Sequence, residues 1–180
     1  MTDGDPDVIT ERGRLRAVGR EPGARASKRT TDRIDASCAR LIAASPSVVL
    51  ADHGPDGLVD LSPKGDPAGF AAVLDEKPLV APDRLANNRF DSQPNLLVDP
   101  AIALIFMLPG HHDTLRVAGD GAIRRDPDLL ARFEVAGRAP RRALKVTVRE
   151  AFLHCAQTMI RAGIWRPEDR PDGTEVAGLA

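Results

Sequence analysis

The sequence predicts one mainly β domain, a small closed or partly closed barrel with peripheral helices. Three observations support this prediction. About seven short segments alternate or are strongly apolar, tight turns rich in Gly, Pro and Asp separate most of them, and only a few segments show helical spacing. At 180 residues the chain is long enough to bury a core without disulfides or metal.

The composition divides the chain into three parts. Residues 1–28 are rich in Asp, Gly, Arg and Pro without a sustained hydrophobic period, so we expect an irregular N-terminal arm. Residues 29–166 hold the predicted strands and helices and form the domain. The tail, residues 167–180, is rich in Pro and Gly and is expected to be loose. The basic stretch 12–29 lacks any nucleic-acid-binding signature, which favours a solvated arm or a strap over a neighbouring subunit.

The first predicted helix begins at Thr31 or Asp32 and ends before Pro46. Its apolar side chains recur at the spacing of one helical face: Ile34, Cys38, Leu41 and Ile42. The stripe must therefore pack on another element. The β-branched segment that follows, residues 47–51, is the first predicted strand.

Further strands follow in quick succession, so antiparallel neighbours are the simplest topology. After the first, strands are expected at 58–61, in two runs of 70–82 broken by a turn at 75–77, and at 101–108, 114–117, 121–124 and 143–148. Helices are expected from about residue 92, at 128–137 and at 150–164. The last of these has an apolar face formed by Phe152, Leu153, Ala156, Met159 and Ile160.

Charge and aromatic content exclude several classes of protein. The net charge is −1 and only 3% of residues are aromatic, which argues against binding nucleic acid through phosphates or stacked bases. Cys38 and Cys155 lie far apart, as expected of free thiols in a reducing compartment. The acidic N-terminus is unlike a secretory signal, and the longest apolar run, 101–108, is too short to cross a bilayer. We expect a cytoplasmic protein without membrane partners.

Polar residues gather where the predicted elements of 57–108 meet. Ser62, Lys64 and Asp66 follow the strand at 58–61. Asn87, Asn88, Arg89, Asp91 and Ser92 precede the next helix. A helix start offers unpaired N–H groups, and a loop that adds Arg, Asn and Ser there is suited to hold an anion. Phosphate is the simplest such anion.

Several ordered motifs carry a family resemblance. They are DLSPKGDPAGF at 60–70, VAPDRLANNRFDSQPNLLVDP at 80–100, DTLRVAG at 113–119, and the run His154, Cys155, Ala156 and Gln157, similar to an HCAK-type element. Together they resemble the flavin-binding split-barrel proteins related to pyridoxamine 5′-phosphate oxidase, in a bacterial branch distinct from the true oxidase. The resemblance implies a split β-barrel, FMN as cofactor, and a homodimer that binds FMN at the subunit interface.

The resemblance also implies roles for particular residues. Asn88, Arg89, Ser92 and Gln93 would hold the FMN phosphate. The strand with Ser62 and Pro63 would lie along the flavin ring, with Lys64 near the phosphate or the pyrimidine edge. Thr114 and Arg116 would reach the cofactor from the partner subunit. Trp165 is either a lid near the ring or an anchor for the tail.

Three hypotheses of function remain open from the sequence. The first is a flavin-dependent oxidoreductase acting on an unidentified small molecule, with no catalytic side chain assigned. The second is a non-catalytic module that binds or senses flavin, deazaflavin or haem. The third is a metal-dependent hydrolase suggested by His111, His112 and Asp113, although adjacent turn residues seldom face one ion, so we predict no metal. The family usually has Lys where this chain has Gln157, which removes one charge.

Overall fold

The computed structural model describes residues 7–19, 30–84, 92–154 and 156–169. The chain divides into two compact units, residues 1–30 and residues 31–180. In the first unit, α1 (Arg12–Val18) forms a short helix that buries none of its side chains. A helix at these residues differs from the expected irregular arm, and no sustained hydrophobic period marks it in the sequence. The bounds predicted for the arm and the tail stay predictions.

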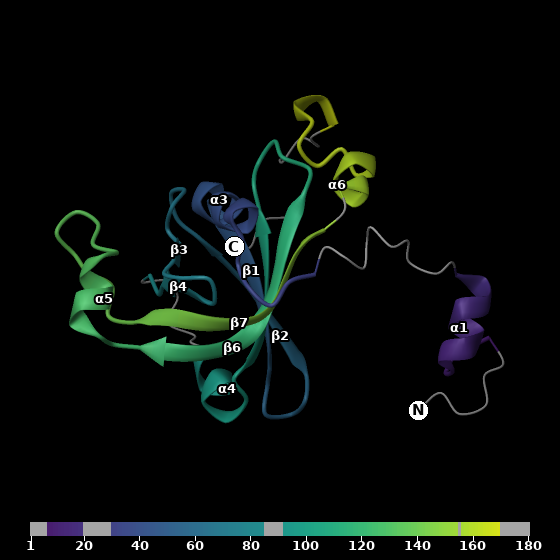
Figure 1. The fold of residues 1–180 in the computed structure, drawn as a ribbon, viewed down its shortest axis with the longest axis horizontal. Coiled ribbons are helices and arrows are strands. Elements are labelled where there is room, and N and C mark those ends of the chain that lie inside the picture. Colours follow the sequence, from purple (N-terminus) through teal and green to yellow (C-terminus); the bar gives the residue numbers. More distant parts are fainter. Residues whose placement is uncertain (1–6, 20–29, 85–91, 155, 170–180) are drawn as a thin grey trace, which may run out of the picture. The chain divides into compact units, whose positions relative to one another are not determined.

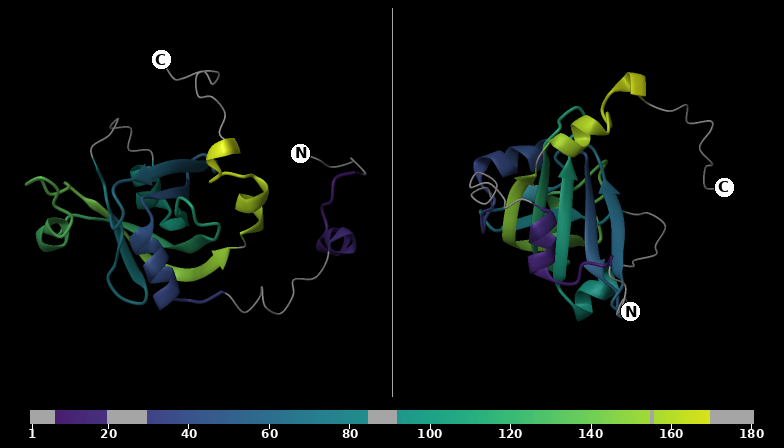
Figure 2. Two further views of the ribbon diagram at one scale, coloured as in Figure 1. Left: turned by 90° about the horizontal axis from the view of Figure 1, so that it is seen from above. Right: turned by 90° about the vertical axis from the view of Figure 1, so that its right-hand side faces the viewer.

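The second unit is built on one antiparallel seven-stranded sheet in the order β2-β1-β5-β6-β7-β4-β3 (Figure 1). The strands are β1 (Ser47–His53), β2 (Val59–Gly65), β3 (Ala72–Val73), β4 (Pro78–Pro82), β5 (Ala101–Met107), β6 (Thr114–Arg124) and β7 (Ala143–His154). Among the described residues, the edge strands β2 and β3 do not pair, so hydrogen bonds do not close the sheet. The sheet instead curves around its core (Figure 2). The mainly β prediction is confirmed.

Short helices surround the sheet. They are α3 (Ala36–Ala44), α4 (Ser92–Val98), α5 (Pro127–Ala131), α6 (Gln157–Arg161) and the 3₁₀ helix η1 (Pro167–Asp169). α5 and α6 lie at opposite ends of the β6–β7 pair (Figure 1). No helix in the part of the chain that the structure describes is long and apolar enough to span a membrane.

The apolar stripe of α3 packs on the main core, as its spacing predicts. The helix starts later than expected, because the Asp35 side chain accepts the Cys38 N–H at 2.8 Å and caps it. Thr31 instead pairs with Ala151 in an isolated bridge. Burial raises the pKa of the Cys38 thiol to about 11, so this thiol stays protonated and unreactive at neutral pH.

The β6–β7 pair differs most from the sequence prediction. The two short strands expected at 114–117 and 121–124 are one strand, and the helix expected at 150–164 is wrong as far as His154. All 11 residues of β6 pair with residues of β7. If residues 150–154 were helical, the part of β6 that pairs with them would lose these backbone partners. The register shifts at Gly119, where a Cβ atom would overlap the Thr147 carbonyl oxygen.

Two smaller differences concern element ends. β2 continues to Gly65, so Ser62 and Lys64 lie within the strand and not after it. The helix predicted at 128–137 stops at Ala131, and the last two residues of the predicted range, Ala136 and Gly137, adopt positive φ values of 51° and 74°, which a helix cannot contain. The expected turn between β3 and β4 is confirmed.

A buried polar cluster joins α4 to β1 and β2. The Asn95 Nδ2 group donates to Asp52 Oδ1 at 2.7 Å and to Asp60 Oδ2 at 2.6 Å. Asp52 is 2% exposed and Asn95 6% exposed, and Asp52 Oδ2 has no partner among the described residues. One amide group therefore donates to two neighbouring carboxylates, and this fixes α4 against the sheet.

Replacing Asn95 with Ala should lower the free energy of unfolding by about 2–4 kcal/mol, because it leaves two adjacent carboxylates without their shared donor. Urea denaturation measures the change. Leu97→Ala, on the same helix with Leu97 80% exposed, is the matched control and should cost less than about 0.5 kcal/mol. Equal losses of unfolding free energy in the two variants would show that the Asn95 hydrogen bonds do not stabilise the protein.

Candidate functional site

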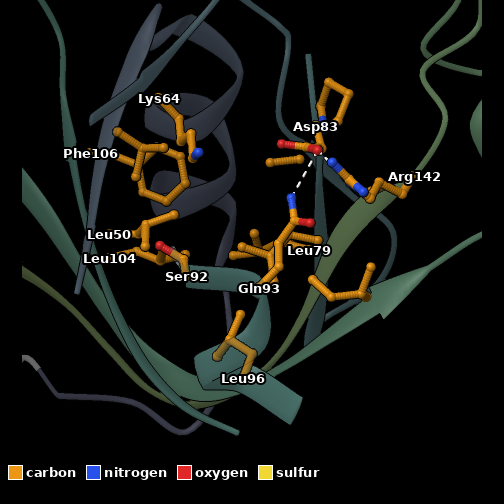
Figure 3. Close-up of a pocket in the computed structure, with 16 residues that line it drawn as sticks. Leu50, Lys64, Leu79, Asp83, Ser92, Gln93, Leu96, Leu104, Phe106 and Arg142 are labelled. Atoms are coloured by element: carbon orange, nitrogen blue, oxygen red, sulfur yellow. Dashed lines mark hydrogen bonds and ion pairs between the residues drawn. The ribbon is translucent and has the colours of Figure 1, made fainter. Parts of the chain in front are cut away.

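A small cavity lies inside the barrel, beneath α4 (Figure 3). Its walls are mainly apolar and include Leu50, Leu79, Leu96, Leu104 and Phe106. The cavity volume is about 40 Å³, which holds only a few water molecules. An aromatic cofactor ring does not fit in this volume.

Polar side chains line the rim of this cavity. Lys64 comes from β2, and Ser92 and Gln93 come from the first turn of α4. The Lys64 side chain is exposed, whereas Ser92 is only 7% exposed. The structure therefore brings together three of the residues predicted to bind the cofactor. Asn88 and Arg89, which were predicted to bind its phosphate, lie outside the described residues.

One carboxylate at this rim, that of Asp83, was not among the site residues predicted from the sequence. Asp83 Oδ2 accepts a hydrogen bond from Gln93 Nε2 at 2.8 Å and another from Arg142 Nε at 2.6 Å (Figure 3). The Gln93 amide is therefore engaged by Asp83. The acid follows β4 and the arginine precedes β7, and only the β4–β7 pairing brings them together. In the sequence, this ion pair is indicated only by two charged residues that each stand directly beside a predicted strand.

Arg84, like its neighbour Asp83, forms two side-chain hydrogen bonds. Its Nε donates to Asp66 Oδ2 at 2.6 Å, and one terminal nitrogen donates to the Phe133 carbonyl oxygen at 2.9 Å. Both charged side chains are less than one third exposed, so solvent screens this pair only partly. The described residues on either side of segment 85–91 are thus held by ionic hydrogen bonds.

Thr114 and Arg116 lie on β6, away from Lys64. Thr114 is buried and faces His154 across the strand pair. The Arg116 guanidinium lies 5.3 Å from the centre of the Phe152 ring and 3.9 Å from Glu150. β1 and β5 separate β2 from β6, and three strand spacings amount to roughly 14 Å. One chain therefore does not bring the β6 residues to the β2 residues.

Trp165 forms a hydrogen bond that connects the segment after α6 to the turn between β5 and β6. Its indole Nε1 donates to the His111 carbonyl oxygen at 2.8 Å. The side chain of His111 lies 3.4 Å from the Asp113 carbonyl oxygen. Within the described ranges, no group of three or more His, Cys, Asp or Glu residues is arranged to hold a metal ion.

The outer face of the sheet is apolar and exposed. Leu61, Ala51, Ala103 and Ala118 form one row across β2, β1, β5 and β6, and Pro63, Val49, Ile105 and Arg116 form the next. Leu61 is 71% exposed, Val59 57% and Ile105 36%. A groove of about 280 Å³ crosses this face over the small alanine side chains. Pro63 and Arg116 thus share an outer row, while Ser62 pairs with Leu50 in an inner one.

Solved structures share this fold. HupZ of Group A Streptococcus is 14% identical, with a TM-score of 0.53 over 67% of this chain and 93% of that chain. A candidate pyridoxamine 5′-phosphate oxidase from Lactobacillus delbrueckii is 20% identical, with a TM-score of 0.54 over 69% and 98%. A conserved hypothetical protein from Mycobacterium tuberculosis is 17% identical, with a TM-score of 0.52 over 72% and 90%. These likenesses confirm the split-barrel fold. No curated protein matches the sequence significantly.

A family model extends the likeness from fold to sequence. The model described as pyridoxamine 5′-phosphate oxidase matches residues 34–155. This match covers more than half of the chain and spans β1 to β7, including the motifs that carry the resemblance. The chain therefore belongs to the pyridoxamine 5′-phosphate oxidase family.

Proposed function

We propose that this protein is an FMN-binding homodimer and a flavin-dependent oxidoreductase that acts on a small molecule. The observation that carries the proposal is the grouping of Lys64, Ser92 and Gln93 at one rim. Proteins of this family commonly bind a flavin. The substrate and the electron donor are left unspecified by these residues.

The charges at the rim suit a phosphate. Lys64 supplies a cation and Ser92 supplies a hydroxyl, and hydrogen bonds from such groups to a dianion are strong. In sequence, Arg89 lies three residues before Ser92 and would add a second cation. The Asp83 carboxylate would repel a phosphate if it were bare. Arg142 and Gln93 both donate to it, which offsets its negative charge at the rim.

The flavin ring is assigned to the outside of the barrel, along Ser62 and Pro63, because the internal cavity is too small for it. Thr114 and Arg116 lie roughly 14 Å from β2 in the same chain, by three strand spacings. In a dimer, the second subunit would bring its own Thr114 and Arg116 to the cofactor. The exposed apolar outer face supports a dimer, since large exposed apolar patches mark interaction surfaces.

FMN, when bound, supplies hydride or electron transfer to a small organic substrate. The contribution of the chain is to bind and orient the cofactor and to adjust its potential through charge. A cation at Lys64 near the polar edge of the ring would favour the reduced, negatively charged form. No side chain needs to act as a general base for this chemistry.

The visible absorption spectrum of the purified protein, recorded before and after FMN is added and the sample is desalted, tests the proposal. Retained flavin on a particle of twice 19.3 kDa is the expected result. A colourless protein would overturn the choice of FMN and favour deazaflavin, haem or no cofactor. A bound flavin that no supplied donor or acceptor reduces or reoxidises would favour a binding or sensing module over an enzyme.

Replacing Lys64 with Gln should weaken FMN binding by about 1.5–3 kcal/mol, the range for a hydrogen bond to a charged group. Titration by quenching of flavin fluorescence measures the affinity. Lys77→Gln is the matched control, because Lys77 pairs with Asp32 on an exposed surface remote from the rim. Unchanged affinity in the Lys64 variant would remove this residue from the site. Arg89→Ala should show a loss of similar size.

Replacing Leu61 with Arg should convert the dimer to a monomer, because it places a charge in the apolar outer face. Light scattering coupled to size exclusion measures the mass. Leu97→Arg is the control, since Leu97 is 80% exposed on α4 and not on the outer face. A dimer that survives the Leu61 change would mean that another surface holds the subunits together. If the flavin lies at this interface, the Leu61 variant should also lose its flavin.

A further inference from the structure

The far end of the β6–β7 pair carries a surface groove that the proposed flavin site does not use. α5 and the turn leading back to β7 form this end of the pair (Figure 1). The groove has a volume of about 580 Å³. It is lined by Arg125, Pro127, Leu130, Ala139, Pro140, Arg141 and Arg142. We call this surface the arginine groove.

The charged residues of the arginine groove are all cationic. Arg125 and Arg141 are exposed and form no ion pair with any residue that the structure describes. The adjacent carboxylate, Asp126, is already paired, because Arg124 donates to its two oxygens at 2.8 and 2.6 Å. The groove therefore holds two guanidinium groups whose charge the described chain does not neutralise, and an anion between them would relieve their repulsion.

The floor of the arginine groove is apolar and firmly supported. Leu130 is 8% exposed, and it packs with Phe133 against Val80 and Ala143 in a second core cluster. Pro127 and Pro140 restrict the backbone on either side. An apolar floor lined by cationic side chains suits a small organic anion, and the volume of the groove lies in the range of ligand sites.

Arg142 connects the arginine groove to the cavity rim, because its side chain lines both. Its Nε donates to Asp83, which also accepts from Gln93. An anion in the groove would therefore lie beside the Arg142–Asp83 ion pair. It would not compete with the flavin for Lys64, Ser92 or Gln93, because none of these residues lines the groove.

We propose that the arginine groove is a second binding site, which takes a small organic molecule carrying a phosphate or a carboxylate group. Arg125 and Arg141 bind the oxyanion through guanidinium hydrogen bonds, and the apolar part of the ligand rests on Leu130 and the flanking prolines. Anion binding at this end of the β6–β7 pair does not depend on the identity of the cofactor at the other site.

Isothermal titration of the full-length protein with phenyl phosphate and, separately, with benzoate tests the proposal. The expected result is saturable binding of at least one probe, weakened by added salt. Arg125→Gln and Arg141→Gln should each lower the affinity by roughly tenfold, the loss of one charged hydrogen bond. Arg132→Gln is the matched control, because this exposed arginine follows α5 but does not line the groove.

The two probes and the Lys64→Gln variant separate the outcomes. Binding of only one probe supports the site and identifies its ligand as a phosphate or a carboxylate. Affinity for FMN should be unchanged in the Arg125 and Arg141 variants, which separates the groove from the proposed flavin site. Binding that is lost in Lys64→Gln but kept in both arginine variants would overturn the proposal, as would failure of both probes to bind. Circular dichroism checks that each variant is folded.

Discussion

The antiparallel pairing of β6 with β7 is the interaction on which most of this structure depends. It extends over all 11 residues of β6 and joins the two parts of the sheet, with β5 and β1 on one side and β4 and β3 on the other. Gly119 makes the pairing possible, because its lack of a side chain lets the Thr147 carbonyl come close at the register shift. One end of the pair carries Thr114 and Arg116, and the other carries the arginine groove. A change in register would therefore move both surfaces together.

A second constraint is the fixing of α4 to the sheet by polar side chains. Asn95 holds one side of the helix to Asp52 and Asp60, and Gln93 holds its beginning to Asp83. These bonds are buried or partly buried, so they specify geometry more strongly than apolar contacts alone. The internal cavity is small, and the polar residues grouped here lie at its rim.

Much of the fold could be predicted from the sequence, and each element that was predicted wrongly has a physical reason. Alternation and turn residues located β1, the β3–β4 hairpin and β5, because these signals are local. The segment after Val148 has apolar residues at spacings compatible with either a helix or a strand, and pairing with β6 decided for the strand. Of the predicted site residues, Lys64, Ser92 and Gln93 do meet, whereas Arg116 lies on β6, which β1 and β5 separate from β2 in the same chain.

The sequence by itself determined the mainly β architecture, the helical stripe of α3 and the motifs of the family, since hydrophobic period, turn chemistry and short motifs are properties of neighbouring residues. Only the tertiary structure decided that Asp83 pairs with Arg142, 59 positions away, and that Asn95 reaches Asp52, 43 positions away. Only the tertiary structure also assembled the arginine groove from both ends of the turn between β6 and β7. These contacts depend on which strands pair and in what register, and that is set by the packing of the whole sheet.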